Sequence, residues 1–153
     1  MRPFLSRYPV TSLLRFFVFL LALTVAGLAA TAPAGTASGA QMTFAFGRTG
    51  GNIRPFTITI AGDGSVTATG PVQTLKSQLD PRQLAKLARV VNAQRFSALP
   101  QKTLCPDALP DVASQFVIVH RGSLTRRVLV HGRCSARFTK IYTALTNAVG
   151  LRL

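Results

Sequence analysis

The sequence predicts an α+β fold in which two helices pack on an antiparallel sheet, in the order β-β-β-α-β-β-α. Short segments alternate apolar and polar residues between glycine-rich turns, which is typical of antiparallel strands. Two other segments carry apolar residues at helical spacing. Because the strands precede each helix in groups, the pattern indicates helices on one sheet, and a length of 153 residues fits a single domain.

The first 40 residues have the organisation of an export signal. Three arginines precede an apolar run over residues 16–30, and small residues follow it. We expect residues 1–32 to be a signal peptide, with cleavage as late as Ala40 as an alternative, and residues 33–41 to be a flexible segment. A retained membrane anchor is the other alternative, but a spanning helix needs about 20 apolar residues and this run is shorter.

Residues 42–153 are predicted to form one domain, which contains the two cysteines, Cys105 and Cys134. In an oxidising compartment an isolated pair of cysteines indicates a structural disulfide, whereas a zinc site needs more ligands. A bridge that closes a loop of about 30 residues stabilises a domain by roughly 3 to 4 kcal/mol in the chain-entropy model. We therefore expect a secreted or envelope-associated protein with this disulfide.

Three segments after the leader alternate apolar and polar residues and predict an antiparallel meander. The predicted strands are residues 42–48, 56–60 and 65–69. Asp63 and Gly64 indicate a two-residue hairpin loop. That loop would place Ile60 opposite Thr67.

Asp80 followed by Pro81 predicts the start of the first helix, because Asp caps a helix and Pro is tolerated at its first position. Leu84, Leu87 and Val91 form an apolar stripe. The helix is expected to end near residue 95.

The next two strands are predicted at residues 113–120 and 124–131, joined by a two-residue turn with glycine first, at Gly122. This register places Val117 opposite Val128. It also brings the two cysteines to one end of the hairpin, which supports the disulfide.

Ser135 is the expected N-cap of the final helix. Phe138, Ile141, Tyr142 and Leu145 follow helical spacing, and a glycine at position 150 ends the pattern. Val149 continues the same spacing, and together these residues form the apolar face of an amphipathic helix.

The sequence favours a binding protein over an enzyme. All four acidic residues are Asp, so pairs for general acid–base chemistry have few candidates. His120 and His131 lie at opposite ends of the predicted hairpin, about 20 Å apart at 3.3 Å per residue, and cannot share a metal. Asp111 beside His131 is the only acid–histidine pairing that the register allows. We expect no catalytic residue, no metal and no cofactor.

Charge points to an anionic partner. The chain carries 18 Lys and Arg against four Asp, for a net charge of +14. The region from residue 112 onward has no acid and includes Arg126, Arg127 and Arg133, our candidate binding residues there. The positive electrostatic potential of these residues attracts anionic envelope polymers, membrane surfaces or acidic proteins. Nucleic acid is not expected behind an export signal, and biased composition remains an alternative explanation of the charge.

Four short motifs suggest a family. They are Phe-Gly-Arg-Thr-Gly-Gly at residues 46–51, Leu-Asp-Pro-Arg-Gln-Leu-Ala at 79–85, Phe-Ser-Ala-Leu-Pro at 96–100 and Pro-Asp-Ala at 106–108. In this order, and with the strand-strand-helix ending, they resemble the emfourin-like proteins, small bacterial inhibitors of thermolysin-like metalloproteases.

The resemblance implies a shared α+β fold and a secreted protease as partner, with a rigid strand-connecting loop in the protease cleft. Arg48, Gly50 and Gly51 match at that loop, and an ordinary turn is the alternative interpretation. The chain departs from the family in its leader, its cysteine pair and its positive charge, and residues 109–111, directly after Pro-Asp-Ala, are Leu-Pro-Asp where aromatic residues are expected. A monomer or weak homodimer is expected.

Overall fold

The computed structural model describes residues 41–152. The predicted signal peptide and the segment that follows it, up to residue 40, lie outside the described residues. Within the described part, neither helix is long and apolar enough to cross a membrane.

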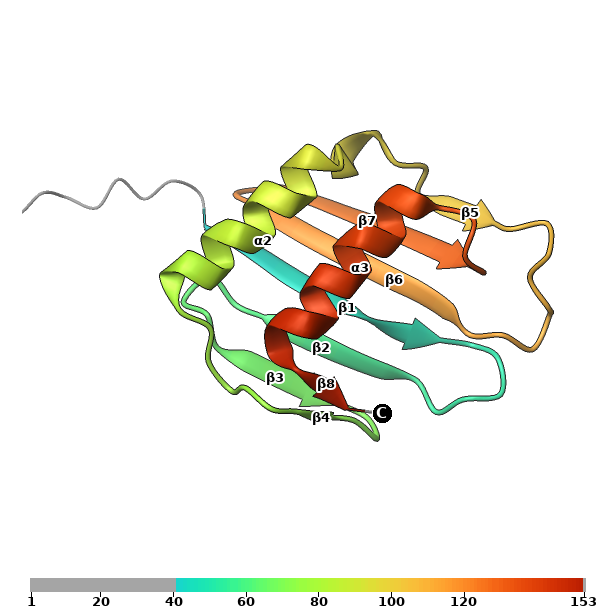
Figure 1. The fold of residues 1–153 in the computed structure, drawn as a ribbon, viewed down its shortest axis with the longest axis horizontal. Coiled ribbons are helices and arrows are strands. Elements are labelled where there is room, and N and C mark those ends of the chain that lie inside the picture. The colour runs from blue at the N-terminus through green and yellow to red at the C-terminus, as the bar shows by residue number, and fades with distance from the viewer. Residues whose placement is uncertain (1–40, 153) are drawn as a thin grey trace, which may run out of the picture. The chain divides into compact units, whose positions relative to one another are not determined.

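The described residues form the predicted α+β fold, with two helices on one face of a six-stranded sheet (Figure 1). The strand order is β3-β2-β1-β6-β7-β5. The sheet strands are β1 (Met42–Thr49), β2 (Phe56–Ile60), β3 (Val66–Thr69), β5 (Lys102–Leu104), β6 (Ser114–Arg121) and β7 (Leu124–His131). The helices are α2 (Pro81–Ala93) and α3 (Ala136–Val149). A second sheet pairs β4 (Gln73–Thr74) with β8 (Leu151–Arg152).

The meander and the second hairpin join into one sheet because β1 pairs with β6 along its whole length. This antiparallel pairing places Phe46 opposite Val117 and Arg48 opposite Gln115. The first strand therefore lies in the middle of the sheet. The face away from the helices has no covering layer among the described elements (Figure 1).

The register of the second hairpin is confirmed, since Val117 faces Val128 and Gly122 has a positive φ of 58° at the first loop position. The register predicted for the first hairpin is wrong by one residue. Ile60 faces Val66 because Gly62, Asp63 and Gly64 form a three-residue loop. Gly64 has a φ of 90°, the left-handed conformation that follows a type I turn in such loops.

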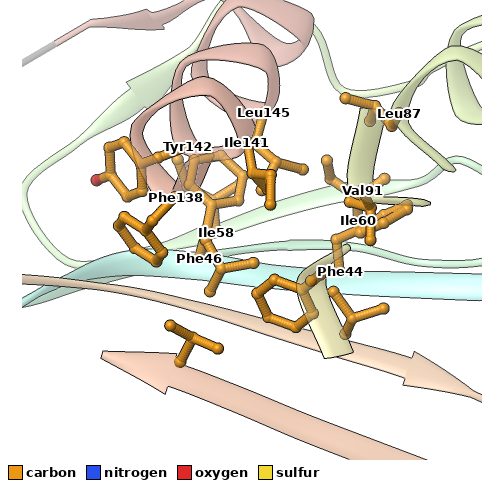
Figure 2. Close-up of a cluster of buried hydrophobic side chains, with 14 of the residues drawn as sticks. Phe44, Phe46, Ile58, Ile60, Leu87, Val91, Phe138, Ile141, Tyr142 and Leu145 are labelled. Carbon is orange, nitrogen blue, oxygen red and sulfur yellow. The ribbon is translucent and has the colours of Figure 1, made fainter. Parts of the chain in front are cut away.

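Apolar side chains from both helices meet the covered face of the sheet in one core (Figure 2). Phe44, Phe46, Ile58 and Ile60 project from the meander, and side chains of the second hairpin extend this surface. The helices contribute Leu87, Val91, Phe138, Ile141, Tyr142, Leu145 and Val149. Burial of this apolar area is the main force that holds the layers together.

Local hydrogen bonds explain where α2 begins and ends and where α3 ends, whereas Ser135, the expected N-cap of α3, makes no side-chain capping bond. Asp80 accepts a hydrogen bond from the Gln83 amide, and the Gln83 side chain accepts one from the Asp80 amide, which completes a capping box. At the far end of α2, Arg137 from α3 donates to the carbonyl oxygens of Gln94 and Arg95. Gly150, with a φ of 63°, ends α3 as expected.

The predicted disulfide between Cys105 and Cys134 is present and ties the chain after β5 to the start of α3. Sequence analysis missed β5, which lies between the predicted first helix and the predicted second hairpin. This strand is three residues long and pairs in parallel with β7, Thr103 lying opposite Val130. A strand this short, next to several prolines, carries too few residues for alternation to reveal it.

Candidate functional site

Three connections gather at one end of the sheet, which we call the loop end. They are residues 50–55 after β1, residues 105–113 between β5 and β6, and residues 132–135 after β7 (Figure 1). The strand directions place them together, because β1 and β7 finish where β2 and β6 begin.

The β1–β2 connection is held against the 105–113 connection. The amide of Asn52 donates a hydrogen bond to the carbonyl oxygen of Asp111, at 3.0 Å. Gly51, with a φ of 63°, packs so closely that a Cβ atom would overlap the backbone of Asp111 and Ala113. Gly50, with a φ of 71°, has open space around it. One glycine of this loop is therefore needed for packing, and the other is exposed at its surface.

The disulfide fixes the remaining connection. Gly132 packs against Cys105 and Ala108, and the amide of Cys134 lies 2.9 Å from the sulfur of Cys105. The residue after Gly132 is Arg133, which is exposed. Its backbone is thus held by the bridge while its guanidinium faces solvent.

A pocket of about 630 Å³ opens between the loop end and α3, and we call it the arginine pocket. Arg48 and Gln115 line it from the sheet, and Arg133 from the loop end. The helix and the chain after it complete the lining with Thr139, Tyr142, Thr143, Thr146, Asn147, Gly150 and Leu151. No acidic side chain is among these residues, so the pocket is positively charged.

Two donors in the arginine pocket are buried and unused. Neither the Nε–H of Arg48 nor the hydroxyl of Tyr142 donates a hydrogen bond to a described residue. The hydroxyl oxygen lies near the Arg48 side chain, which acts to lower its pKa. Tyr142 is only 6% exposed. A buried polar atom without a partner costs about 1 to 3 kcal/mol. A bound acceptor would remove that cost.

The position of Tyr142 is set by its ring. The ring meets Phe46 edge-on, with centroids 5.8 Å apart, and stacks on Phe138 at 6.0 Å. In Figure 2 its oxygen points away from Ile60 and Val91. Burial raises the pKa of the Tyr142 hydroxyl above 10.0, and the positive charge of Arg48 opposes this shift. The hydroxyl is therefore protonated at neutral pH and can donate.

A smaller hollow of about 260 Å³ lies beside the first and shares Arg48, Gln115 and Arg133 with it. Asn52, Ile53 and the residues from Asp111 to Ala113 supply the rest of its lining together with Gly132. The two arginines thus stand between two hollows of the same loop end.

The other predicted binding arginines lie elsewhere. Arg126 donates to the carbonyl oxygen of Leu99 and lines a largely apolar hollow of about 540 Å³ near the tip of the second hairpin. Arg127 lies on the open face of the sheet, 5.3 Å from the ring centroid of Phe116. Of the six candidates, the structure brings Arg48, Gly50, Gly51 and Arg133 to the loop end and separates Arg126 and Arg127 from it.

The histidines have structural partners. His131 Nε2 donates to the Leu109 carbonyl oxygen at 3.1 Å, and Nδ1 lies 3.2 Å from the Ser114 hydroxyl. His120 Nδ1 lies 2.7 Å from the hydroxyl of Thr125. Within residues 41–152, no group of three His, Cys, Asp or Glu side chains could hold a metal ion.

Sequence analysis did not name Gln115 or Tyr142 as candidate site residues, although both line the arginine pocket. Tyr142 matched the apolar spacing of a helix, and its ring is indeed in the core. The hydroxyl at the margin of that core was the available signal, because a buried tyrosine normally has a hydrogen-bond partner. Gln115 carried no signal, since its role depends on the pairing of β6 with β1.

Comparison of the chain with protein-family models gives no match, and comparison with curated proteins gives none either.

Proposed function

We propose that this protein is an exported binding module that holds an anionic partner at its loop end. One observation carries the proposal: Arg48 and Arg133, distant in sequence, line the same pocket, which has no acidic side chain. The disulfide is compatible with an extracellular location. The leader supports export, and the net charge of +14 favours association with acidic surfaces.

The site favours binding because its backbone is already ordered. The Asn52–Asp111 hydrogen bond holds the connection that follows Arg48, and the Cys105–Cys134 bridge holds the connection that carries Arg133. A preformed site loses less conformational entropy when a partner binds. The nearby His131 has both ring nitrogens within hydrogen-bond distance of structural partners, Ser114 and Leu109.

The following experiment distinguishes anion binding at the loop end from non-specific attraction by the net positive charge. The chain is loaded on an immobilised acidic polysaccharide and eluted with a salt gradient. We expect the double variant R48Q/R133Q to elute at clearly lower salt than R82Q/R89Q, which removes the same charge from the exposed surface of α2. Equal elution of the two variants would show that net charge alone drives retention and would overturn the proposal.

The β1–β2 connection, residues 50–55, is held in place by a hydrogen bond and by packing. This supports a second candidate function, inhibition of a secreted metalloprotease. Gly51 is fixed under Asp111 while Gly50 is free at the surface, so the loop is presented in one conformation. An inhibitor of this kind would reduce thermolysin activity even in high salt, and G51A would weaken inhibition more than G50A because only G51A breaks the packing. Unchanged thermolysin activity at micromolar protein would remove this candidate.

A further inference from the structure

Two residues that line the arginine pocket, Arg48 and Tyr142, have unused buried donors that indicate which chemical group fits there. Arg48 Nε and the Tyr142 hydroxyl both present a hydrogen that no described residue accepts. A group that satisfies them must offer acceptor oxygens. Because Arg48 and Arg133 add two positive charges, an oxygen acceptor with negative charge fits best.

We propose that the arginine pocket binds a carboxylate on a hydroxyl-bearing chain, of the kind found in sugar acids. The proposal rests on the proposed function and names the acidic group and the place where it is held. The carboxylate lies against Arg48, Tyr142 and Gln115, and the rest of the chain extends along α3.

The shape of the donor set favours a carboxylate. The Nε side of a guanidinium can present two parallel N–H donors, which match the two oxygens of a planar carboxylate. Gln115 lies opposite Arg48 in the sheet and brings an amide to the same pocket. The Tyr142 hydroxyl is protonated at neutral pH, since burial raises its pKa.

The helix wall favours hydroxyl groups next to that carboxylate. Thr139, Thr143, Thr146 and Asn147 line the pocket along α3. The hydroxyls of Thr139 and Thr146 donate to the carbonyl oxygens of Ser135 and Thr143, each at 3.0 Å, so the hydroxyl oxygens remain available as acceptors. Acceptors of this kind match sugar hydroxyls, which donate, and do not match a second carboxylate, which only accepts.

Tyr142 itself reports on binding. The chain has no Trp and two Tyr, of which the other is Tyr8. In the full chain carrying Y8F, tyrosine emission therefore comes from Tyr142 alone. We would titrate this protein with trigalacturonate at low ionic strength and pH 7, and with neutral trigalactose, triglutamate and inorganic phosphate in parallel.

Trigalacturonate is expected to change the emission in a saturable way, whereas trigalactose produces no change. R48Q should weaken binding by tenfold or more, R48K by a smaller factor because the bidentate edge is lost, and R89Q by less than twofold. Y142F lacks the hydroxyl and keeps the aromatic ring, so it has no tyrosine emission to follow. Its binding is measured instead from the NMR shift of the Arg48 Nε–H signal. We expect its affinity for trigalacturonate to be reduced a few fold.

Three results would overturn the proposal: no saturable change with trigalacturonate, equal affinity of R48Q and R89Q, or triglutamate or phosphate binding as tightly as trigalacturonate. These three results can be distinguished from a result that contradicts anion binding at the loop end. If R48Q/R133Q still lowers retention on the acidic column, the loop end binds anions and only the sugar-acid assignment is wrong.

Discussion

The guanidinium of Arg127 lies over the ring of Phe116, 5.3 Å from its centroid. Phe116 is on the open face of the sheet and is nevertheless only 6% exposed. Gly47 on the neighbouring strand leaves room for the ring, whose edge lies 3.1 Å from where a Cβ of Gly47 would be. The arginine and the glycine together explain how a large aromatic side chain stays covered without a second layer.

Replacement of Arg127 by Ala should therefore lower the free energy of unfolding. A cation–π contact at an exposed site contributes about 0.5 to 1 kcal/mol. Urea denaturation measures the change, with R89A on the exposed surface of α2 as the control. A loss no larger than that of the control would show that Arg127 does not stabilise Phe116.

Removal of the Asp80 side chain should destabilise α2. D80A loses the bond to the Gln83 amide, and loss of an N-cap costs about 1 kcal/mol. D80N keeps an acceptor oxygen at this position and should cost much less. Thermal unfolding of both variants checks the prediction, which fails if the two midpoints coincide.

Reduction of the Cys105–Cys134 bridge should lower stability by about 3 to 4 kcal/mol, the value expected for a closed loop of this length. Unfolding in urea with and without reductant measures the difference, and the double variant C105S/C134S serves as its control. Mass spectrometry of the native chain should show a gain of about two mass units on reduction. Identical stability in both conditions would contradict this prediction.

Tyr142 should make the protein sensitive to alkali. Its pKa is higher in the folded protein than in the unfolded chain, so the unfolded chain loses the proton first as pH rises above about 10. The stability contributed by the neutral phenol is present below this pH and falls as pH rises through the folded pKa. Y142F lacks the effect, so the difference in unfolding free energy between native protein and Y142F should change from pH 9 to pH 11. If the unfolding free energies of the native protein and Y142F changed equally with pH, the prediction would be wrong.

Local patterns predicted most of the elements. Alternation located the meander and the second hairpin, and Asp80 with Pro81 located the start of α2. Long-range relations were not predictable in the same way. Alternation shows which residues face the core but does not name the partner of a strand, so the pairing of β1 with β6 was not foreseen.

The candidate site depends on that pairing. Arg48 stood out through a motif and Arg133 through charge, and nothing in the sequence placed them beside each other. They meet because β1 and β6 align Arg48 with Gln115 and because the disulfide fixes the chain after β7. That the Tyr142 hydroxyl donates to no described residue could be recognised only from the structure, because it depends on which residues surround the side chain.

The central place of β1 has a consequence for how the chain acquires its structure. Its neighbour β6 begins at Ser114, 65 residues after β1 ends. A strand cannot form hydrogen bonds along both edges until both neighbouring strands have been synthesised. Contacts between segments so far apart in sequence form slowly. A ribosome must therefore release most of the polypeptide before the sheet can close.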